Sequence, residues 1–328
     1  MKNKNFKTMK SIMFSISAIV LFVLLFGCTK KETFYENDNK PTIDFLQPWA
    51  FYEKNEEDIF EHFTKLNNIG IDTLIIQNIA KFDNGTPEVC YYDSLINFPK
   101  KYNDFLEKML KAAKHFNIKI IVGLPNDSYW WSYQDHGYRS DVMNVFYEEE
   151  SNVLKEILTK YEIDGIYYAN EMFSNPHSYY KSWSKHLNKL LEDINSINPQ
   201  MPFYISPFNS SAFLKNHKNC ETEWENFFKN VNFREIDYFM IQDGFGGCEA
   251  DPKEREYKEI FERNTKIREK CLKYSKANFI LNIELFASDG YTSKKRLEKQ
   301  IAYANMLGNK IACFSVSHYF IDEEDIFK

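Results

Sequence analysis

The 328-residue sequence lacks the patterns that mark metal and redox centres. It has six cysteines and seven histidines, but no CxxC pair, no HxH pair and no HExxH motif. Zinc ribbons, thioredoxin-like redox sites and helix-borne zinc sites therefore have no support. We expect neither a catalytic metal nor a cofactor.

Two further absences narrow the class of partner. Lysine and arginine number 41 against 47 aspartates and glutamates, which leaves a net charge of −6. No basic stripe appears, so a nucleic-acid partner is not expected. No glycine-rich phosphate loop follows the first apolar run, which disfavours a dinucleotide-binding fold. The 44 % of hydrophobic residues is enough for a sizeable core without disulfide staples.

The N-terminal segment has the pattern of a bacterial lipoprotein signal. A basic stretch, "MKNKNFKTMK", precedes the apolar run "SIMFSISAIVLFVLLF" and the pair Gly27-Cys28. The run is short for a full span, which disfavours an uncleaved membrane anchor. We interpret 1–27 as a signal peptide, Cys28 as the lipidated first residue and the polar stretch 28–41 as a flexible tether. The predicted location is the cell envelope, in the outer membrane, on its periplasmic or its external side.

Eight short apolar runs recur along the rest of the chain, each nearly continuous, as a strand covered on both faces requires. They are 42–49, 72–79, 118–127, 165–171, 202–210, 237–244, 279–286 and 310–319. Stripes of helical spacing lie between them, for example Ile59, Phe63 and Leu66. This alternation predicts an α/β fold, a (β/α)₈ TIM barrel that occupies 42–328 as a single domain.

The C-terminal ends of the predicted strands carry candidate site residues, because reactive groups lie at that end of such barrels. Amides, indoles and an imidazole follow the apolar runs directly, where an ordinary solvated loop would favour lysine, glutamate and serine. The candidates are Gln47, Trp49, Gln77, Asn126, Asp127, Asn170, Gln242, Asp243, His318 and Tyr319. For Asp127 a capping or loop role competes with a sugar contact, and for Asp243 a turn role does.

Two strand ends carry a glutamate, Glu171 after the fourth run and Glu284 after the seventh. Burial in a partly dry mouth raises a carboxyl pKa, and a neighbouring carboxylate raises one member of a pair further. A general acid beside an ionised carboxylate is what glycoside hydrolysis needs. The alternative is that each glutamate forms a structural salt bridge at the rim of the barrel.

Two adjacent indoles, Trp130 and Trp131, follow the third run in "SYWW". Sugar rings have apolar C–H faces that stack on such side chains. We expect one indole to form a platform for sugar and the other to join the core, because neighbours in extended chain point opposite ways. Trp49 is a second candidate platform, and His318 with Tyr319 is a candidate hydrogen-bonding pair at the mouth.

The pair Asn170-Glu171 and the later Glu284 resemble the ends of the fourth and seventh strands in clan-A glycoside hydrolases. The chain is more specifically similar to a bacterial family known as domain of unknown function 4434, through "GIDTLIIQ", "GLPNDSYWW", "NEMF", "YISPF", "IQDGFG", "NIELF" and "CFSVSHY". The clan resemblance implies that Glu171 is the acid/base, Asn170 the contact to the sugar 2-hydroxyl and Glu284 the nucleophile. Clan-A enzymes often hold the nucleophile with a tyrosine or histidine on the sixth strand, where this chain has Gln242-Asp243.

We therefore expect a lipid-anchored, retaining glycoside hydrolase that acts on an oligosaccharide or polysaccharide in the envelope or outside the cell. One alternative is a non-catalytic glycan-binding lipoprotein on the same barrel, because a fold does not imply a function. Another is an envelope structural or assembly protein, which would expose an apolar patch away from the barrel mouth.

Overall fold

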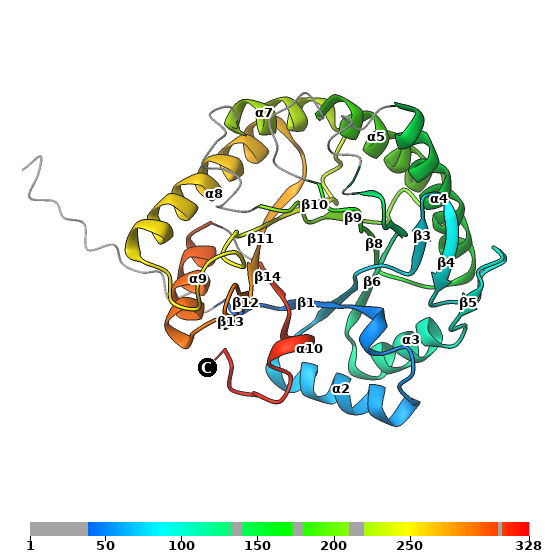
Figure 1. Ribbon diagram of the computed structural model, residues 1–328, viewed down its shortest axis with the longest axis horizontal. Coiled ribbons are helices and arrows are strands. Elements are labelled where there is room, and N and C mark those ends of the chain that lie inside the picture. Colours follow the sequence, from blue (N-terminus) through cyan, green and yellow to red (C-terminus); the bar gives the residue numbers. More distant parts are fainter. Residues whose placement is uncertain are drawn as a thin grey trace, which may run out of the picture. The chain divides into compact units, whose positions relative to one another are not determined.

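The computed structural model describes residues 39–130, 132, 140–172, 180–209, 220–307 and 310–327. Eight parallel strands close into a barrel in the order β1-β14-β11-β10-β9-β8-β6-β2 (Figure 1). They are β1 Ile43–Leu46, β2 Thr73–Ile76, β6 Lys119–Gly123, β8 Gly165–Tyr168, β9 Phe203–Ile205, β10 Tyr238–Gln242, β11 Asn278–Glu284 and β14 Ile311–Phe314. Each coincides with one of the eight predicted runs, so the predicted TIM barrel is confirmed.

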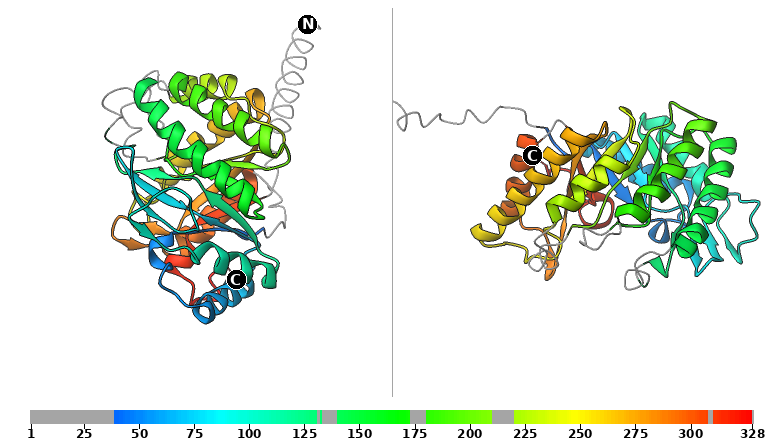
Figure 2. Two further views of the ribbon diagram at one scale, coloured as in Figure 1. Left: turned by 90° about the vertical axis from the view of Figure 1, so that its right-hand side faces the viewer. Right: turned by 90° about the horizontal axis from the view of Figure 1, so that it is seen from above.

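Helices cover the outside of the barrel wall (Figures 1 and 2). They are α2 Glu56–Ile69, α3 Phe105–Phe116, α4 Ser140–Lys160, α5 Tyr180–Ile197, α7 Cys220–Asn230, α8 Glu254–Tyr274, α9 Lys294–Leu307 and the short α10 Val316–Tyr319. Local sequence explains the ends of α2: Asn55 and Asp58 form a capping box at its start, and Gly70 takes φ 99° at its end. No helix in the part of the chain that the structure describes is long and apolar enough to cross a membrane.

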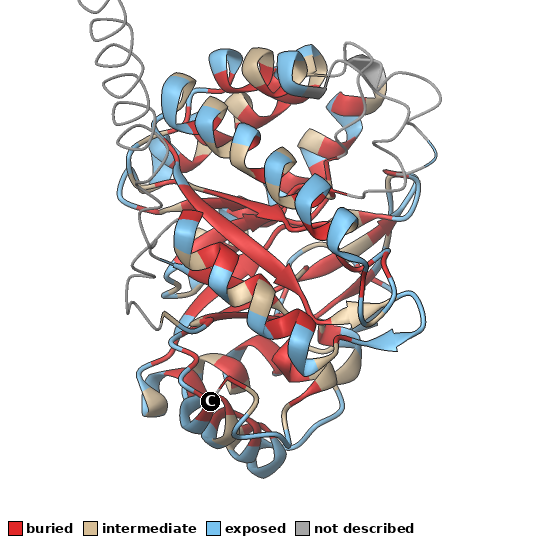
Figure 3. Cartoon of the chain, turned by 90° about the vertical axis from the view of Figure 1, so that its left-hand side faces the viewer, coloured by how far each residue is buried: buried red, intermediate tan, exposed pale blue. Residues whose placement is uncertain are grey.

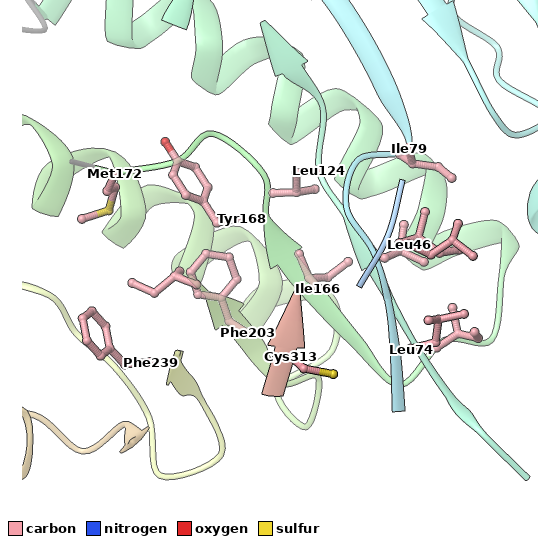
Figure 4. Packing of buried hydrophobic residues seen from close by; sticks show 14 of the residues in the cluster. Leu46, Leu74, Ile79, Leu124, Ile166, Tyr168, Met172, Phe203, Phe239 and Cys313 are labelled. Carbon is pink, nitrogen blue, oxygen red and sulfur yellow. The ribbon is translucent and has the colours of Figure 1, made fainter. Parts of the chain in front are cut away.

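The core has two parts, one on each side of the barrel wall. The inner part fills the barrel and consists of Ile43, Phe45, Ile75, Ile121, Tyr167, Ala169, Tyr204, Met240, Ile280 and Ala312. The outer part lies between strands and helices and includes Leu46, Ile166 and Phe203 (Figure 4). Successive strand residues point to opposite faces, so both sets of positions are apolar and the strands are buried almost throughout (Figure 3).

A four-stranded sheet outside the barrel, in the order β5-β4-β3-β7, was not predicted. Its strands are β3 Ala80–Asp83, β4 Thr86–Cys90, β5 Lys100–Lys101 and β7 Asn126–Asp127. β3 and β4 form a hairpin whose turn, Asn84-Gly85, has φ values of 49° and 79°. An Asn-Gly turn suits the twist of a hairpin because both residues tolerate positive φ. The sheet follows β2 in the chain and pairs with the residues that leave β6, so it extends the wall of the mouth on that side.

Some sequence predictions fall outside the described residues. These are the signal peptide, the lipidation of Cys28, most of the tether and the position of Trp131. Their tests are biochemical.

Candidate active site

A pocket of about 350 Å³ opens at the C-terminal end of the barrel, within the size range of small-molecule sites. Its lining is Gln47, Trp49, Gln77, Asn78, Lys81, Asn126, Ala169, Glu171 and Phe314. The alternation of strand residues explains the set. Gln47 continues the inward series of Ile43 and Phe45, and Glu171 continues that of Tyr167 and Ala169. Five of the predicted site residues, Gln47, Trp49, Gln77, Asn126 and Glu171, therefore share one cavity.

Glu171 is held in this pocket by two neighbours. Its Oε1 accepts a hydrogen bond from Gln242 Nε2 at 2.9 Å, and its backbone oxygen accepts one from Trp130 Nε1 at 2.6 Å. Burial raises the pKa of the Glu171 carboxyl, and the bond from Gln242 partly offsets that rise. A carboxyl of this kind stays protonated closer to neutral pH, as a general acid must.

Glu284 lies at the same end of the barrel but is paired with Asp243. The two residues are 2 % and 1 % exposed. Glu284 Oε2 accepts a hydrogen bond from Gly246 N at 2.6 Å, while Asp243 accepts from Phe245 N at 3.0 Å and from Gln300 Nε2 at 2.5 Å. Burial, and next the charge of Asp243, raise the pKa of Glu284 well above its usual range. Two buried carboxyls in contact cannot both ionise readily, which is why the neighbouring charge adds to the effect of burial.

The predicted nucleophile is therefore turned toward Asp243 and does not line the 350 Å³ pocket. The sixth strand of the barrel, β10, contributes to both carboxyl groups. Gln242 faces inward and holds Glu171, whereas Asp243 faces outward and contacts Glu284. The clan resemblance implies a sixth-strand residue that holds the nucleophile, and in this chain the contact comes from Asp243.

Asn170 points away from the pocket, contrary to the predicted contact with a sugar hydroxyl. It is 1 % exposed. Its Nδ2 donates to Glu150 Oε1 at 2.7 Å and to Pro125 O at 3.4 Å, and its Oδ1 accepts from Asn126 Nδ2 at 3.0 Å and Asp127 N at 3.2 Å. Both amide hydrogens are thus engaged inside the protein. Asn170 joins the ends of β6 and β8 to α4, which positions its neighbours instead of touching substrate.

Asp127 has the loop role that was the alternative to a sugar contact. It is 2 % exposed. Its carboxylate accepts hydrogen bonds from Asn84 N at 3.3 Å, Gly85 N at 3.0 Å and Tyr129 N at 2.7 Å. Asp127 therefore fastens the β3–β4 turn to the end of β6.

Trp130 belongs to the core and is not a sugar platform. It is 0 % exposed, and its ring lies 5.3 Å from that of Phe146, centroid to centroid. Trp49, by contrast, is 55 % exposed and lines the pocket, so it is the indole among the described residues that a sugar ring can reach. Trp49 lines the pocket as expected. Of the two adjacent indoles, one was expected to join the core, and Trp130 is the one that does so, while Trp131 lies outside the described residues.

His318 and Tyr319 lie on α10, behind the pocket lining. His318 Nε2 accepts a hydrogen bond from Gln47 N at 2.9 Å, and its ring stacks on Trp49 at 5.9 Å. Burial lowers the pKa of His318 to about 4, so the ring is neutral at physiological pH. Tyr319 packs against Phe286. The rings of His318 and Tyr319 meet edge to face with centroids 6.3 Å apart. His318 therefore supports Gln47 and Trp49, and a joint hydrogen-bonding role of the two residues toward a ligand stays a prediction.

The sequence reading missed Lys81 and Phe314, both of which line the pocket. Lys81 lies on β3, in the unpredicted sheet, and the pair Asn84-Gly85 was the signal that could have revealed it. Within the described ranges no group of three or more histidine, cysteine or acidic side chains is placed to hold a metal ion.

A larger groove, of about 760 Å³, lies between α8 and α9. Its lining includes Tyr257, Phe261, Tyr303 and Met306, together with lysines and glutamates of the two helices. It lacks convergent buried polar groups, so the smaller pocket at the barrel mouth is the better candidate for chemistry.

Comparison with known proteins agrees with a glycoside-hydrolase-like barrel. A proposed α-L-fucosidase from Bacteroides thetaiotaomicron is 20 % identical, with a TM-score of 0.65 over 89 % of this chain and 92 % of that one. An endo-β-1,4-mannanase from Thermotoga petrophila is 14 % identical, with a TM-score of 0.55 over 86 % and 68 %. An endo-1,4-β-mannanase from Rhizomucor miehei is 13 % identical, with a TM-score of 0.54 over 86 % and 91 %.

Identities this low show a shared fold and no more. None of the curated proteins compared with the chain matches it. The family described as a domain of unknown function, DUF4434, matches residues 45–324, so the protein belongs to that family.

Proposed function

We propose that the protein is a glycoside hydrolase in which Glu171 is the general acid and Glu284 the second carboxyl group. The observation that carries the proposal is the position of Glu171. It lines a polar pocket at the C-terminal end of the barrel, and burial raises the pKa of its carboxyl. This is the chemical state that protonation of a glycosidic oxygen requires.

The hydrogen bond to Glu171 assigns its two oxygens different tasks. Oε1 accepts from Gln242, so the acidic proton belongs on Oε2, which can donate it to the leaving-group oxygen. In a retaining mechanism Glu284 then attacks the anomeric carbon as a carboxylate, and water later releases the sugar with Glu171 acting as base. Glu284 can take that role when it gives up its proton to Asp243 and turns toward the substrate.

A second candidate function is glycan binding without turnover. The observation that favours it is the state of Glu284, which is 2 % exposed and hydrogen-bonded to Gly246 N. A nucleophile in that position must move before it can react. A barrel that keeps the pocket and leaves Glu284 in place binds sugar and does not cleave it.

Hydrolysis of a panel of polysaccharides and aryl glycosides separates the two functions. Glu171→Gln should slow cleavage of unactivated substrates by a factor of about 100 or more and spare aryl glycosides, which need little protonation. Glu284→Gln should abolish the cleavage of both. Glu235→Gln is the matched control, because Glu235 is exposed and precedes β10 at the opposite end of the barrel. Normal turnover in both active-site variants contradicts the assignment, and binding without turnover in the unmodified protein selects the second function.

We also propose that the chain is a cell-envelope lipoprotein of the outer membrane, attached through Cys28 and acting on an envelope or external glycan. The basic stretch, the apolar run and Gly27-Cys28 support this proposal. Cys28→Ser should remove fatty-acid labelling and release the protein from the membrane fraction, whereas Cys90→Ser should do neither. Labelling that persists in Cys28→Ser contradicts the anchor.

A further inference from the structure

The mouth pocket contains a cation without a counter-charge. Lys81 lines the pocket and is half-buried. Other lysines of the protein form ion pairs, such as Lys65 with Asp322 at 2.8 Å and Lys270 with Glu225 at 2.6 Å. Lys81 forms neither an ion pair nor a hydrogen bond with any residue in the described ranges. An ammonium group in a half-buried pocket is stabilised by an anion, and no acidic side chain of the described residues lies within ion-pair distance of Lys81.

Apart from Lys81 and Glu171, the polar groups that line the pocket are neutral amides. Amide groups come from Gln47, Gln77, Asn78 and Asn126. The pocket's one carboxyl group, on Glu171, bonds to an amide of the sixth strand and not to the lysine. The protonated form of Glu171, which the proposed mechanism needs, carries no charge. Lys81 then determines the sign of the charge inside the pocket.

The net charge of the chain, −6, does not cancel this local effect. At physiological ionic strength charges are screened over about 8 Å, so a ligand in the pocket responds mainly to the groups that line it. A negatively charged group that reaches Lys81 gains a charge-assisted hydrogen bond, which is about twice as strong as a neutral one.

The other lining groups suit a sugar that carries this negative charge. Gln47 Nε2 donates to Gln77 Oε1 at 2.7 Å, which orients both amides. Gln47 Oε1 and Gln77 Nε2 have no other hydrogen-bond partner within the described part of the chain, so an acceptor and a donor remain for hydroxyl groups. Trp49, 55 % exposed, offers an apolar face for the ring. Hydroxyl contacts, a stacking surface and an anion-binding group thus converge in one cavity.

We propose that the pocket binds glycans whose sugar units carry an anionic group, a uronate carboxylate or a sulfate ester, and that Lys81 pairs with that group. The inference rests on the proposed function, because it names the substrate class of the same site. The pocket is at the lower end of the range for ligand sites, so the anionic group belongs to a sugar unit at or beside the bond that Glu171 protonates.

Calorimetric binding to the full-length protein tests the inference with matched pairs of ligands, one member anionic and the other neutral at the same position. One arm compares uronate oligosaccharides, including oligogalacturonides and alginate oligomers, with their methyl esters. The other arm compares sulfated glycan oligosaccharides with their desulfated forms. The acidic member of at least one pair should bind about tenfold to a hundredfold more tightly, and the preference should shrink as salt is added. A preference in the first arm alone identifies a carboxylate, and one in the second alone identifies a sulfate.

Variants of Lys81 assign the preference to this side chain. Lys81→Gln should remove it and Lys81→Arg should keep most of it. Lys100→Gln, an exposed lysine of the same sheet outside the pocket, should keep all of it. Thermal unfolding of each variant verifies that the fold is intact. Equal binding of acid and neutral forms, no binding of any pair, or a preference that survives in Lys81→Gln overturns the inference.

The same experiment separates this inference from the proposed function. Acidic glycan that binds through Lys81 and is never cleaved supports the substrate class and refutes hydrolysis. Neutral glycan that is cleaved in a Glu171-dependent manner, with no preference for acidic forms, supports hydrolysis and refutes the role of Lys81.

Discussion

Replacing Asn170 with alanine should destabilise the protein strongly. The amide donates to Glu150 Oε1 at 2.7 Å, and the other oxygen of Glu150 is bonded to His186 Nε2, also at 2.7 Å. Glu150 and His186 are 0 % and 2 % exposed, so water cannot replace the lost partner without entering the core. Asn126 Nδ2 and Asp127 N lose their acceptor as well.

The magnitude follows from these three contacts, and the long bond from Asn170 Nδ2 to Pro125 O at 3.4 Å is left out of the sum. A hydrogen bond to a charged group contributes about 1.5–3 kcal/mol and each neutral one about 0.5–1.5 kcal/mol, which gives a loss of about 2.5–6 kcal/mol for Asn170→Ala. Domains have about 5–15 kcal/mol of stability in all, so the variant should unfold at clearly lower urea concentration.

Urea unfolding followed by tryptophan fluorescence and circular dichroism measures the loss. A double-mutant cycle with Glu150→Gln should give a coupling of about 0.5–3 kcal/mol, because the two side chains are in contact. Asn152→Ala, an exposed asparagine on α4, is the control and should change the stability by less than about 0.5 kcal/mol. A loss below about 1 kcal/mol in Asn170→Ala, together with impaired sugar binding, would refute the reasoning, because it would show that Asn170 faces the substrate.

The two indoles at the mouth should respond oppositely: Trp130→Ala should destabilise the protein by about 3–5 kcal/mol, because the side chain is 0 % exposed and donates to the Glu171 carbonyl. Trp49→Ala should leave the melting temperature unchanged and weaken glycan binding by about 1–3 kcal/mol, by analogy with other ring stacking; calorimetry and thermal unfolding distinguish the two, and the reverse pattern contradicts the structure. Burial lowers the pKa of His62 to about 3, so on acidification His62 is protonated in the unfolded state before it is protonated in the folded state. The free energy of unfolding should therefore fall by up to ~1.4 kcal/mol per pH unit below about pH 6.5. Burial raises the pKa of Asp44 from 3.8 to about 6, so the contribution of Asp44 to the free energy of unfolding is present at low pH and is lost as the pH rises through 6. Between pH 3.8 and about pH 6 this effect opposes that of His62. His62→Gln should therefore be less sensitive to acid than the unmodified protein in urea titrations at pH 7 and pH 5, and an unchanged sensitivity excludes His62 as the cause.

The apolar runs in the sequence were sufficient to predict the strands of the barrel, but they did not reveal the four-stranded sheet beside its mouth. Each barrel strand is buried on both faces, so the sequence shows it as an apolar run. The strands β3, β4, β5 and β7 are two to five residues long and mix polar with apolar side chains, so no run marks them. Lys81 reaches the pocket from one of these strands, and its place in the site was therefore not predictable from apolar patterning.

The alternation of inward and outward side chains along a strand predicted which residues face the pocket, wherever the strand stays regular up to its end. Gln47 and Glu171 each lie two residues beyond an inward apolar side chain, Phe45 and Ala169, and both line the cavity. The same rule places Asn170 outward, so the family resemblance misled where the alternation did not.

The sequence by itself determined the closed barrel, the end of it that carries the polar residues and the presence of Glu171 there, because these depend on apolar period and chain order. Tertiary structure alone decided the chemical states of the site. Asp243 and Glu284 are 41 residues apart, and the pKa of Glu284 is raised because two neighbouring strands bring the two carboxyls together in a dry interior. Asp127 is occupied by a turn 42 residues earlier. A carboxyl group's pKa depends on desolvation and on nearby charge, and both are properties of the packed chain that no local pattern contains.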